Sequence, residues 1–319
     1  MTRSATSSLV IDTDAGSDDA VALVLALTNP RVHVHAITLV SGNVPVEMAI
    51  QNALYTRELC RSTAPVHVGA DRPLLRQQVF AHEVHGSDGM GDIGLPLTGR
   101  DPDEGHAVDV LIDLARSHPG EITLVTLGPL TNVALALRKA PDIAGLFHRV
   151  VMMAGTGDGS GNVTPAAEFN VYVDPEAAEI VFGSGMALEM VGWDVSRNDT
   201  TLTSHDVAQL AAAGPMGRFC MSIQRQLIEF SLKATQMEDF DLPDPLTVAV
   251  AIDRALVTRH ERRHVDIETT GTHTAGMTVV DQLGVTGKAP NVDVVRGVDR
   301  ERFMQMLRTA GALETSGAV

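Results

Sequence analysis

The chain has 319 residues, 44% of them hydrophobic, so it is long enough to bury a large core and is not a disordered protein. Acidic residues outnumber basic ones by 40 to 24, and the formal net charge of −16 argues against nucleic acid and anionic membrane surfaces as partners. No apolar run reaches the ~18 to 20 residues of a membrane span, the first residues lack a signal-like apolar segment, and Cys60 and Cys220 lack metal-type spacing. We therefore expect a cytoplasmic protein with reduced thiols.

The stretch LVIDTDAGSDDA, residues 9–20, combines a short strand with a turn rich in carboxylates. Leu9–Ile11 is predicted to be a buried strand, and a helix from about Asp18 to Leu27 follows it. Four aspartates lie within eight residues: Asp12, Asp14, Asp18 and Asp19. Carboxylates this close repel one another, so we expect a hard divalent cation, calcium or magnesium, to hold them. The simpler alternative is an acidic helix cap followed by a surface loop.

Strands and helices alternate over the next part of the chain. Strands are predicted at 32–40, 66–68, 122–127, 149–153 and 187–191, with helices at 46–61, 106–117 and from 131 onward. This alternation predicts an α/β fold: one domain spanning residues 1–319, with an open, mostly parallel, Rossmann-like sheet and helices on both faces.

The remaining segments are less regular. Residues 203–236 are predicted to be helical, Asp244 begins another helix, alternation over 260–287 suggests strands that close one edge of the sheet, and the last helix covers about 298–311. Residues 71–105 form a long loop rich in Gly, His and Asp, and loops of this length are usually functional or mobile. We expect Thr131, Asn132 and Asp174 to cap helices.

Polar residues follow several predicted strands, at the edge where open parallel sheets bind ligands. Asn43 follows the second strand, and the stretch after strand 149–153 contains Asn162, Glu168 and Asn170. Amides and carboxylates suit a polyhydroxylated ring, because each sugar hydroxyl both donates and accepts hydrogen bonds. For Asn43 an ordinary turn residue is the alternative.

Five segments together resemble the nucleoside hydrolases, the inosine-uridine-preferring N-ribohydrolase family. They are DTDAGSDDA (12–20), the turn that ends at Asn43, LGPLTN (127–132), NVTPAAEFN (162–170) and DPLTVA (244–249). The long loop adds a similar segment with His85 at the histidine position, for which a solvated loop histidine is the alternative. The resemblance spans nearly the whole chain and implies the nucleoside hydrolase fold and a homodimer or homotetramer.

The resemblance also implies roles for individual residues. Calcium would be held by Asp14, Asp19, Asp244 and the backbone carbonyl of Leu127. Asp14 would act as general base for a calcium-bound water that hydrolyses the N-glycosidic bond of a ribonucleoside, giving ribose and free base. Five residues would bind the ribose: Asp18, Asn43, Asn162, Glu168 and Asn170.

This sequence departs from the family pattern where the base should bind. Ala15 replaces a proline of the signature, and Pro243 replaces a histidine that would assist departure of the base. The tyrosines of the base pocket lack counterparts, since Leu227, Phe230 and Ser231 occupy that region. Three residues are candidates for contacting the base: His82, His85 and Trp193, the last of which is more often a core residue. The base could be purine, pyrimidine or nicotinamide.

Two other functions fit parts of the sequence. Asp12 could be the nucleophile of a haloacid-dehalogenase-like phosphatase, although none of the three lysines is suitably placed for that chemistry. The chain could also be a non-catalytic, calcium-dependent nucleoside- or ribose-binding protein, with Ala15 and Pro243 marking lost catalysis. Only a measurement of turnover separates the binder from the hydrolase.

Overall fold

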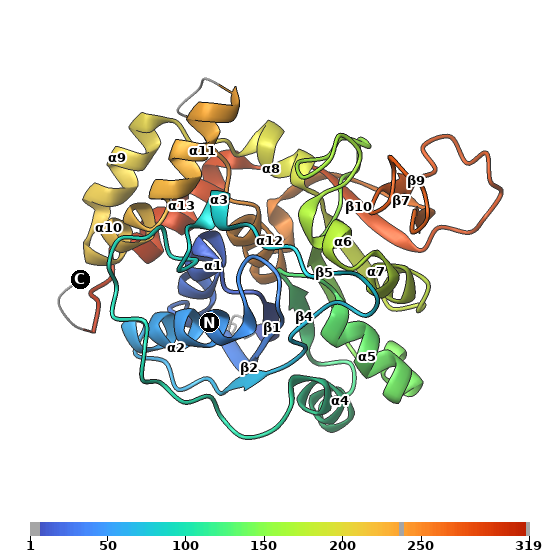
Figure 1. Ribbon diagram of the computed structural model, residues 1–319, viewed down its shortest axis with the longest axis horizontal. Helices are drawn as coiled ribbons and strands as arrows, with labels where there is room; N and C mark the ends of the chain where they lie inside the picture. The colour runs from blue at the N-terminus through green and yellow to red at the C-terminus, as the bar shows by residue number, and fades with distance from the viewer. Residues whose placement is uncertain (1–6, 236–238, 317–319) are drawn as a thin grey trace, which may run out of the picture.

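The computed structural model describes residues 7–235 and 239–316 and has an eight-stranded sheet at its centre (Figure 1). The strand order is β3-β2-β1-β4-β5-β6-β10-β7, and all neighbours are parallel except β7, which runs antiparallel to β10. The strands are β1 (Ser7–Thr13), β2 (Val32–Leu39), β3 (Val66–Val68), β4 (Thr123–Thr126), β5 (Arg149–Met153), β6 (Leu188–Val191), β7 (Val257–Arg263) and β10 (Val292–Val298). The predicted open, mostly parallel sheet is therefore confirmed.

The strand order reverses between β1 and β4. The chain proceeds outward from β1 through β2 to β3, then returns to the other side of β1 and proceeds through β4, β5 and β6. At such a switch point the loops after the two central strands separate, and ligands bind in the crevice at their carboxyl ends. The aspartate-rich turn follows β1 and LGPLTN follows β4, so the topology brings these two segments to the same place.

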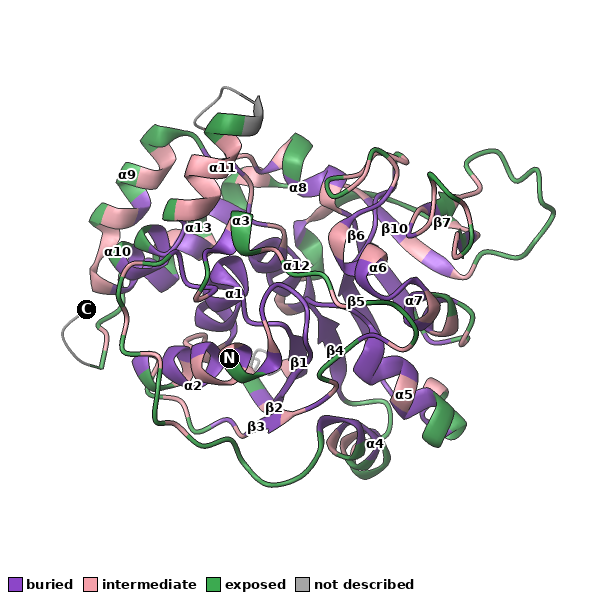
Figure 2. Cartoon of the chain, in the orientation of Figure 1, coloured by how far each residue is buried: buried purple, intermediate pink, exposed green. Residues whose placement is uncertain are grey.

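Helices cover both faces of the sheet, as predicted, because successive strand residues point to opposite sides. Leu9 and Ile11 pack with α1 (Ser17–Leu27), α2 (Val46–Leu59) and α12 (Pro243–Ile252). Val10 packs on the other face with α4 (Ala107–Ser117), α5 (Thr131–Lys139) and α7 (Pro175–Phe182). Figure 2 shows the strands buried between these layers.

The helical region predicted at 203–236 consists of three separate helices. These are α9 (Ser204–Ala213), α10 (Pro215–Ser222) and α11 (Arg225–Thr235), while residue 236 lies outside the described residues. Pro215 explains the first break, because its ring excludes a backbone donor and favours the first turn of a new helix. The last helix, α13 (Arg300–Gly311), packs against α9 and α10. Shorter helices are α3 (His82–His85), α6 (Phe169–Val173) and α8 (Trp193–Asp199), with 3-10 turns at Pro141–Gly145 and Arg254–Leu256.

The prediction for residues 260–287 is only partly right. The sheet is closed by β7, but β10, outside the predicted range, lies between β6 and β7. The strands β8 (Val265–Ile267) and β9 (Thr278–Val280) form a separate two-stranded sheet. The edge strand β7 carries exposed charged residues, a common protection against pairing with another chain.

The long loop packs over the turns that follow β1 and β2. Asn52 Nδ2 donates to the carbonyl of Ala15 (3.0 Å) and to that of Asp88 in the loop (3.0 Å). The amide of Ala81 donates to the carbonyl of Asn43 (2.9 Å). These bonds hold residues 81–92 beside the carboxylate-rich turn.

Within the described residues, no helix has the length and apolar character needed to cross a membrane.

An ion pair between the half-buried Arg149 and the buried Glu189 anchors α12, the helix that carries Asp244. Arg149 Nη1 lies 2.6 Å from a carboxylate oxygen of Glu189, and Arg149 Nη2 donates to the carbonyl of Ala251 (2.8 Å) in the last turn of α12. Carbonyls in the last turn have no partner within the helix, so the guanidinium satisfies both groups at once. Arg254 adds a second contact to Glu189, at 2.9 Å.

We predict that Arg149→Leu lowers the free energy of unfolding by about 2 to 3 kcal/mol, because it leaves a buried carboxylate and helix-end carbonyls without their main partner. Arg116→Leu is the matched control: Arg116 pairs with Asp142 at the surface, where solvent screens the charges, so its loss should change the free energy of unfolding far less. Urea unfolding in one buffer measures both. Equal losses would contradict the anchoring role.

Candidate active site

Asp14 lies immediately beyond β1, with glycines closely packed around it. A Cβ atom on Gly42 would lie 2.0 Å from Asp14 Oδ2, and one on Gly128 would lie 3.0 Å from Asp14 Cγ. Any larger residue at 42 would displace the carboxylate, so the glycine is required by this close approach. The turns after β1, β2 and β4 therefore meet around one aspartate.

Asn43 fixes the orientation of Asp14. Its backbone N–H donates to Asp14 Oδ2 (2.6 Å) and its Nδ2 to Asp14 Oδ1 (3.1 Å). The same amide nitrogen lies 3.3 Å from Asp19 Oδ2. Asn43 thus bridges two of the predicted metal ligands and is more than a turn residue.

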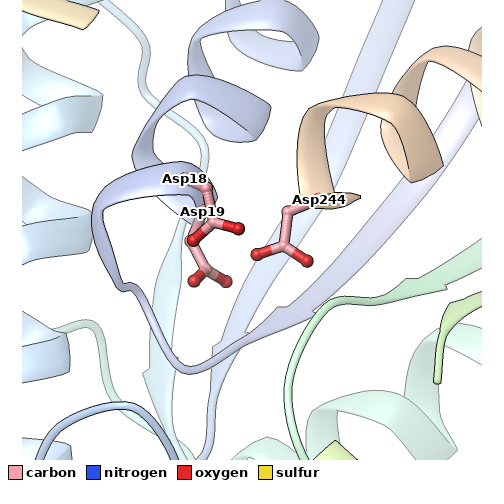
Figure 3. Close-up of side chains that lie close together, drawn as sticks. All are labelled: Asp18, Asp19 and Asp244. Atoms are coloured by element: carbon pink, nitrogen blue, oxygen red, sulfur yellow. The ribbon is translucent and has the colours of Figure 1, made fainter. Parts of the chain in front are cut away.

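Three further carboxylates converge from two helices. Asp18 and Asp19 lie in the first turn of α1, Asp244 lies in the first turn of α12, and one oxygen of each falls within 4.8 Å of the others. Figure 3 shows the Asp244 carboxylate directed across the gap toward those of Asp18 and Asp19. The Gly16 N–H (2.8 Å) and the Thr13 hydroxyl donate to Asp19. Both helices present their N-terminal ends here, where negative charge is favoured.

All four carboxylates are buried, and this burial disfavours their ionisation. Burial, then the charge of Asp19, raises the pKa of Asp14 well above its usual range. Burial, then the charges of Asp18 and Asp19, does the same for the pKa of Asp244. The pKa of Asp18 is raised to about 6, mainly by burial. The site therefore binds protons strongly unless a cation replaces them.

The residues present fit a hard cation such as calcium. One carboxylate oxygen of Asp18 is buried without a hydrogen-bond partner. In the described part of the chain, His85 is the one basic side chain within ion-pair distance of the four carboxylates, with Nδ1 3.6 Å from Asp18. Burial lowers the pKa of His85 to about 4, so the imidazole is neutral at pH 7 and does not balance the charge. An all-oxygen donor set with several carboxylates is the kind that calcium prefers.

Asn170 positions the carbonyl of Leu127, the predicted main-chain ligand. Its Nδ2 donates to that carbonyl (2.7 Å) and to the carbonyl of Met153 (3.1 Å). These carbonyls belong to the ends of β4 and β5, so Asn170 holds two neighbouring strands in register at the site. A carbonyl oxygen has two lone pairs, so Leu127 retains one for another partner.

Two predicted ribose ligands are engaged with the backbone. Glu168 caps α6, accepting from the N–H groups of Gly155 (2.7 Å) and Asn170 (2.8 Å). Asn162 is exposed, and its Oδ1 accepts from the N–H of Phe169 (3.0 Å). Both side chains shape the loop after β5, which is a structural role that the motif alone did not indicate.

His85 is buried rather than solvated. Its Nδ1 lies 3.0 Å from the Ser17 hydroxyl, and Ser17 in turn contacts Gln224, which donates to the Ser17 carbonyl (2.8 Å). Gln224 lies between α10 and α11 and was not predicted from the sequence, because an isolated glutamine in a helical segment carries no distinctive signal. His82, by contrast, is exposed.

The last two predicted positions lie at helix starts. Trp193 is half-buried at the beginning of α8, and the guanidinium of Arg197 lies 4.6 Å from its ring centroid. Pro243 occupies the first turn of α12, directly before Asp244. Proline is well suited to that position, since the backbone donor it lacks would have no helical acceptor there.

Asn132 was predicted to cap a helix, but it does not. Leu130 is the N-cap of α5, and Asn132 Nδ2 donates to Asp12 Oδ1 (2.8 Å) and to the Leu39 carbonyl (2.9 Å). Asp12 also accepts from the Thr38 hydroxyl (2.6 Å). These buried polar groups join β1, β2 and α5 beneath the site. The sequence signal that could have predicted this buried polar network is Asp12 itself, an aspartate within a buried strand.

Thr131 and Asp174 complete this support. Thr131 donates to Asp174 Oδ2 (2.6 Å), so it too contacts a side chain instead of capping its own helix. Asp174 caps α7 by accepting from Ala177 N–H (3.1 Å), as predicted.

Ala15 has a positive φ of 50°, which proline cannot adopt. The turn here therefore differs locally from one built on the proline of the family signature.

Comparisons with known proteins agree with this architecture. Residues 9–305 match the inosine-uridine preferring nucleoside hydrolase family. The pyrimidine-specific ribonucleoside hydrolase RihA of Salmonella arizonae is 41% identical over 305 residues, covering 94% of this chain and 96% of that protein. The plant nucleoside hydrolase PpNRh1 superposes with a TM-score of 0.88 at 33% identity, covering 96% of this chain and 99% of the other.

A purine-preferring ribonucleoside hydrolase from Gardnerella vaginalis is nearly as similar in structure, with a TM-score of 0.87 at 31% identity over 96% of this chain and 99% of the other. The named base thus differs between relatives that share the fold. Sequence and structure agree over almost the entire length, which confirms the predicted resemblance. The chain belongs to the inosine-uridine preferring nucleoside hydrolase family.

Proposed function

We propose that this protein hydrolyses the N-glycosidic bond of ribonucleosides in a calcium-dependent reaction, releasing ribose and free base. The observation that carries the proposal is the group of buried carboxylates Asp18, Asp19 and Asp244, with Asp14 beside it, in a chain of the nucleoside hydrolase family. Among the described residues, these carboxylates have no charged basic partner. The whole chain acts as one domain, and the family resemblance supports a homodimer or homotetramer.

Asp14, Asp19, Asp244 and the Leu127 carbonyl would hold the calcium ion, which when bound supplies positive charge that acidifies a neighbouring water. Asp14 is the general base. Asn43 donates hydrogen bonds to both oxygens of its carboxylate, and these bonds fix the orientation of the side chain. A buried carboxylate is also a stronger base than one in water, because its ionised form is poorly solvated.

The acidic cluster also stabilises the sugar as the bond breaks. Departure of the base leaves positive charge on the ribose ring, and carboxylates fixed in a buried site stabilise that charge without having to reorganise. Asp18, with one oxygen free of hydrogen bonds, and Asn43 are the ribose ligands that face the cluster. Asn162, Glu168 and Asn170, in the loop after β5 and the start of α6, would bind the ribose with lone pairs or donors not spent on the backbone.

Departure of the base has no evident acid. Pro243 has no proton to give, and His85 is neutral at pH 7 because its pKa is lowered to about 4 by burial. We therefore propose a preference for bases that leave without protonation. A nicotinamide riboside meets this condition, because its ring nitrogen is already cationic and nicotinamide leaves as a neutral molecule.

Calcium removal and loss of Asp14 should each abolish turnover. We expect a chelator to stop ribose release reversibly, and Asp14→Asn to lower kcat by at least ~100-fold with the fold intact, because the amide cannot accept the water's proton. The exposed Asp101→Asn serves as control and should be unaffected. A reducing-sugar assay measures release. Undiminished activity in the chelated enzyme, or in Asp14→Asn, would contradict the assigned roles.

Stabilisation by calcium should grow with pH. The folded-state pKa of Asp18 is raised to about 6, so the folded protein binds protons more tightly than the unfolded chain, and its stability without calcium falls as pH rises through that value. Protons and calcium compete for the same oxygens, so the rise in Tm caused by calcium should be larger near pH 8 than near pH 5. Thermal unfolding with and without calcium measures this rise, and Asp244→Asn should remove most of it. A rise that does not change with pH would oppose the assignment.

Introducing a histidine at position 243 tests whether the lack of a general acid sets the preference for the base. We expect the wild type to cleave nicotinamide riboside with a higher kcat than uridine or inosine. Pro243→His should raise kcat for uridine or inosine by ~10-fold or more, and leave nicotinamide riboside nearly unchanged, because only bases that need protonation benefit. Equal effects on all three substrates would refute this explanation. No release from any of them, with binding still detected by calorimetry, would favour the non-catalytic binding protein.

A further inference from the structure

Three histidines meet at the end of the sheet opposite the carboxylate cluster. His33 and His35 lie near the start of β2, and His118 follows the last residue of α4. The ring centroids of His33 and His35 are 4.4 Å apart, and those of His35 and His118 are 4.8 Å apart. Since His33 pairs with Ser8, six residues before Asp14, this cluster lies about 20 Å from the predicted calcium site.

An irregularity in β2 brings these rings to one face. Leu9 pairs with Val34 and Val10 pairs with Ala36, so His35 is an extra residue in a β-bulge. Val34 packs with the α1 and α2 layer, whereas Ala36 packs with the α4 layer. Bulges redirect side chains in this way, and α4 packs directly on β2, which places His118 against His35.

Two ring nitrogens of this cluster have no partner. His35 Nε2 and His118 Nδ1 are both buried without a hydrogen bond. Burying such a group costs about 1 to 3 kcal/mol unless something satisfies it. Burial, followed by the neighbouring His33 and His118, lowers the pKa of His35, which favours the neutral imidazole with its free lone pair. Glu121 lies near enough to oppose that shift and adds a negative charge beside the rings.

We propose that His33, His35 and His118 bind one late first-row transition metal ion, with Zn²⁺ as the representative. Neutral imidazoles are preferred ligands of zinc, copper and nickel, and two histidines of one strand with a third from the end of the helix packed on it can supply three nitrogens. Among the described residues, Asp18, Asp19 and Asp244 are the group whose ligand atoms all lie within 4.8 Å of one another, and the three histidines are not yet that close. The exposed His33 ring must therefore turn toward the other two when the ion binds.

Cobalt gives a direct readout of this site. The full-length protein is first saturated with calcium, so that the carboxylates are occupied, and then titrated with Co²⁺. We expect the visible absorption of a nitrogen-bound, four-coordinate cobalt ion at one equivalent per chain, and its loss when Zn²⁺ is added. His35→Gln and His118→Gln should each weaken cobalt binding by at least ~10-fold.

Two variants keep the test decisive. His33→Gln changes an exposed side chain, so it should fold normally and still weaken binding. His205→Gln, an exposed histidine on α9, is the matched control and should bind cobalt like the wild type. Thermal unfolding without transition metal verifies that each variant is folded. Absence of the cobalt spectrum in the wild type, or its persistence in folded His35→Gln or His118→Gln, would overturn the proposal.

Discussion

The structure around the candidate site is constrained by the mutual repulsion of four buried carboxylates. Asp14, Asp18, Asp19 and Asp244 are held where water cannot screen them, and the nearest basic side chain among the described residues is a neutral histidine. Folding can tolerate this only with protons or a cation in the cluster. In the proposed reaction, the same unbalanced negative charge would stabilise the sugar as it becomes cationic. In that proposal, the feature that costs stability is also the one that serves the chemistry.

Hydrogen bonds from three asparagines hold the surrounding segments together despite that repulsion. Asn43 bridges Asp14 and Asp19, Asn132 joins β1 to β2 and α5 through Asp12, and Asn170 joins the ends of β4 and β5. These three amides each contact more than one chain segment at the same edge of the sheet. A side-chain amide can donate and accept at once, so it links acidic groups and backbone carbonyls without adding charge. The site is thus supported by neutral crosslinks instead of basic side chains.

In the proposed site, the ribose and the base would be bound by different kinds of structure. Two of the proposed ribose contacts are Asp18, in the first turn of α1, and Asn43, in the turn after β2. His85, a candidate for contacting the base, lies in the long loop and meets Gln224 of the α10–α11 junction through Ser17. Loops and helix junctions tolerate substitution better than a buried strand edge does. This agrees with relatives that share the fold yet are named for different bases.

The sequence by itself determined the parallel sheet, most of its strands and the aspartate cluster, because strand periodicity and the segment DTDAGSDDA are local signals. Only the tertiary structure decided which side chains face the site. It showed that Glu168 and Asn162 bind backbone groups, that Asn132 crosslinks strands, and that β10 enters the sheet between β6 and β7. A motif specifies which groups are present, but each polar side chain takes its partner from residues distant in the chain, and that choice depends on the completed packing.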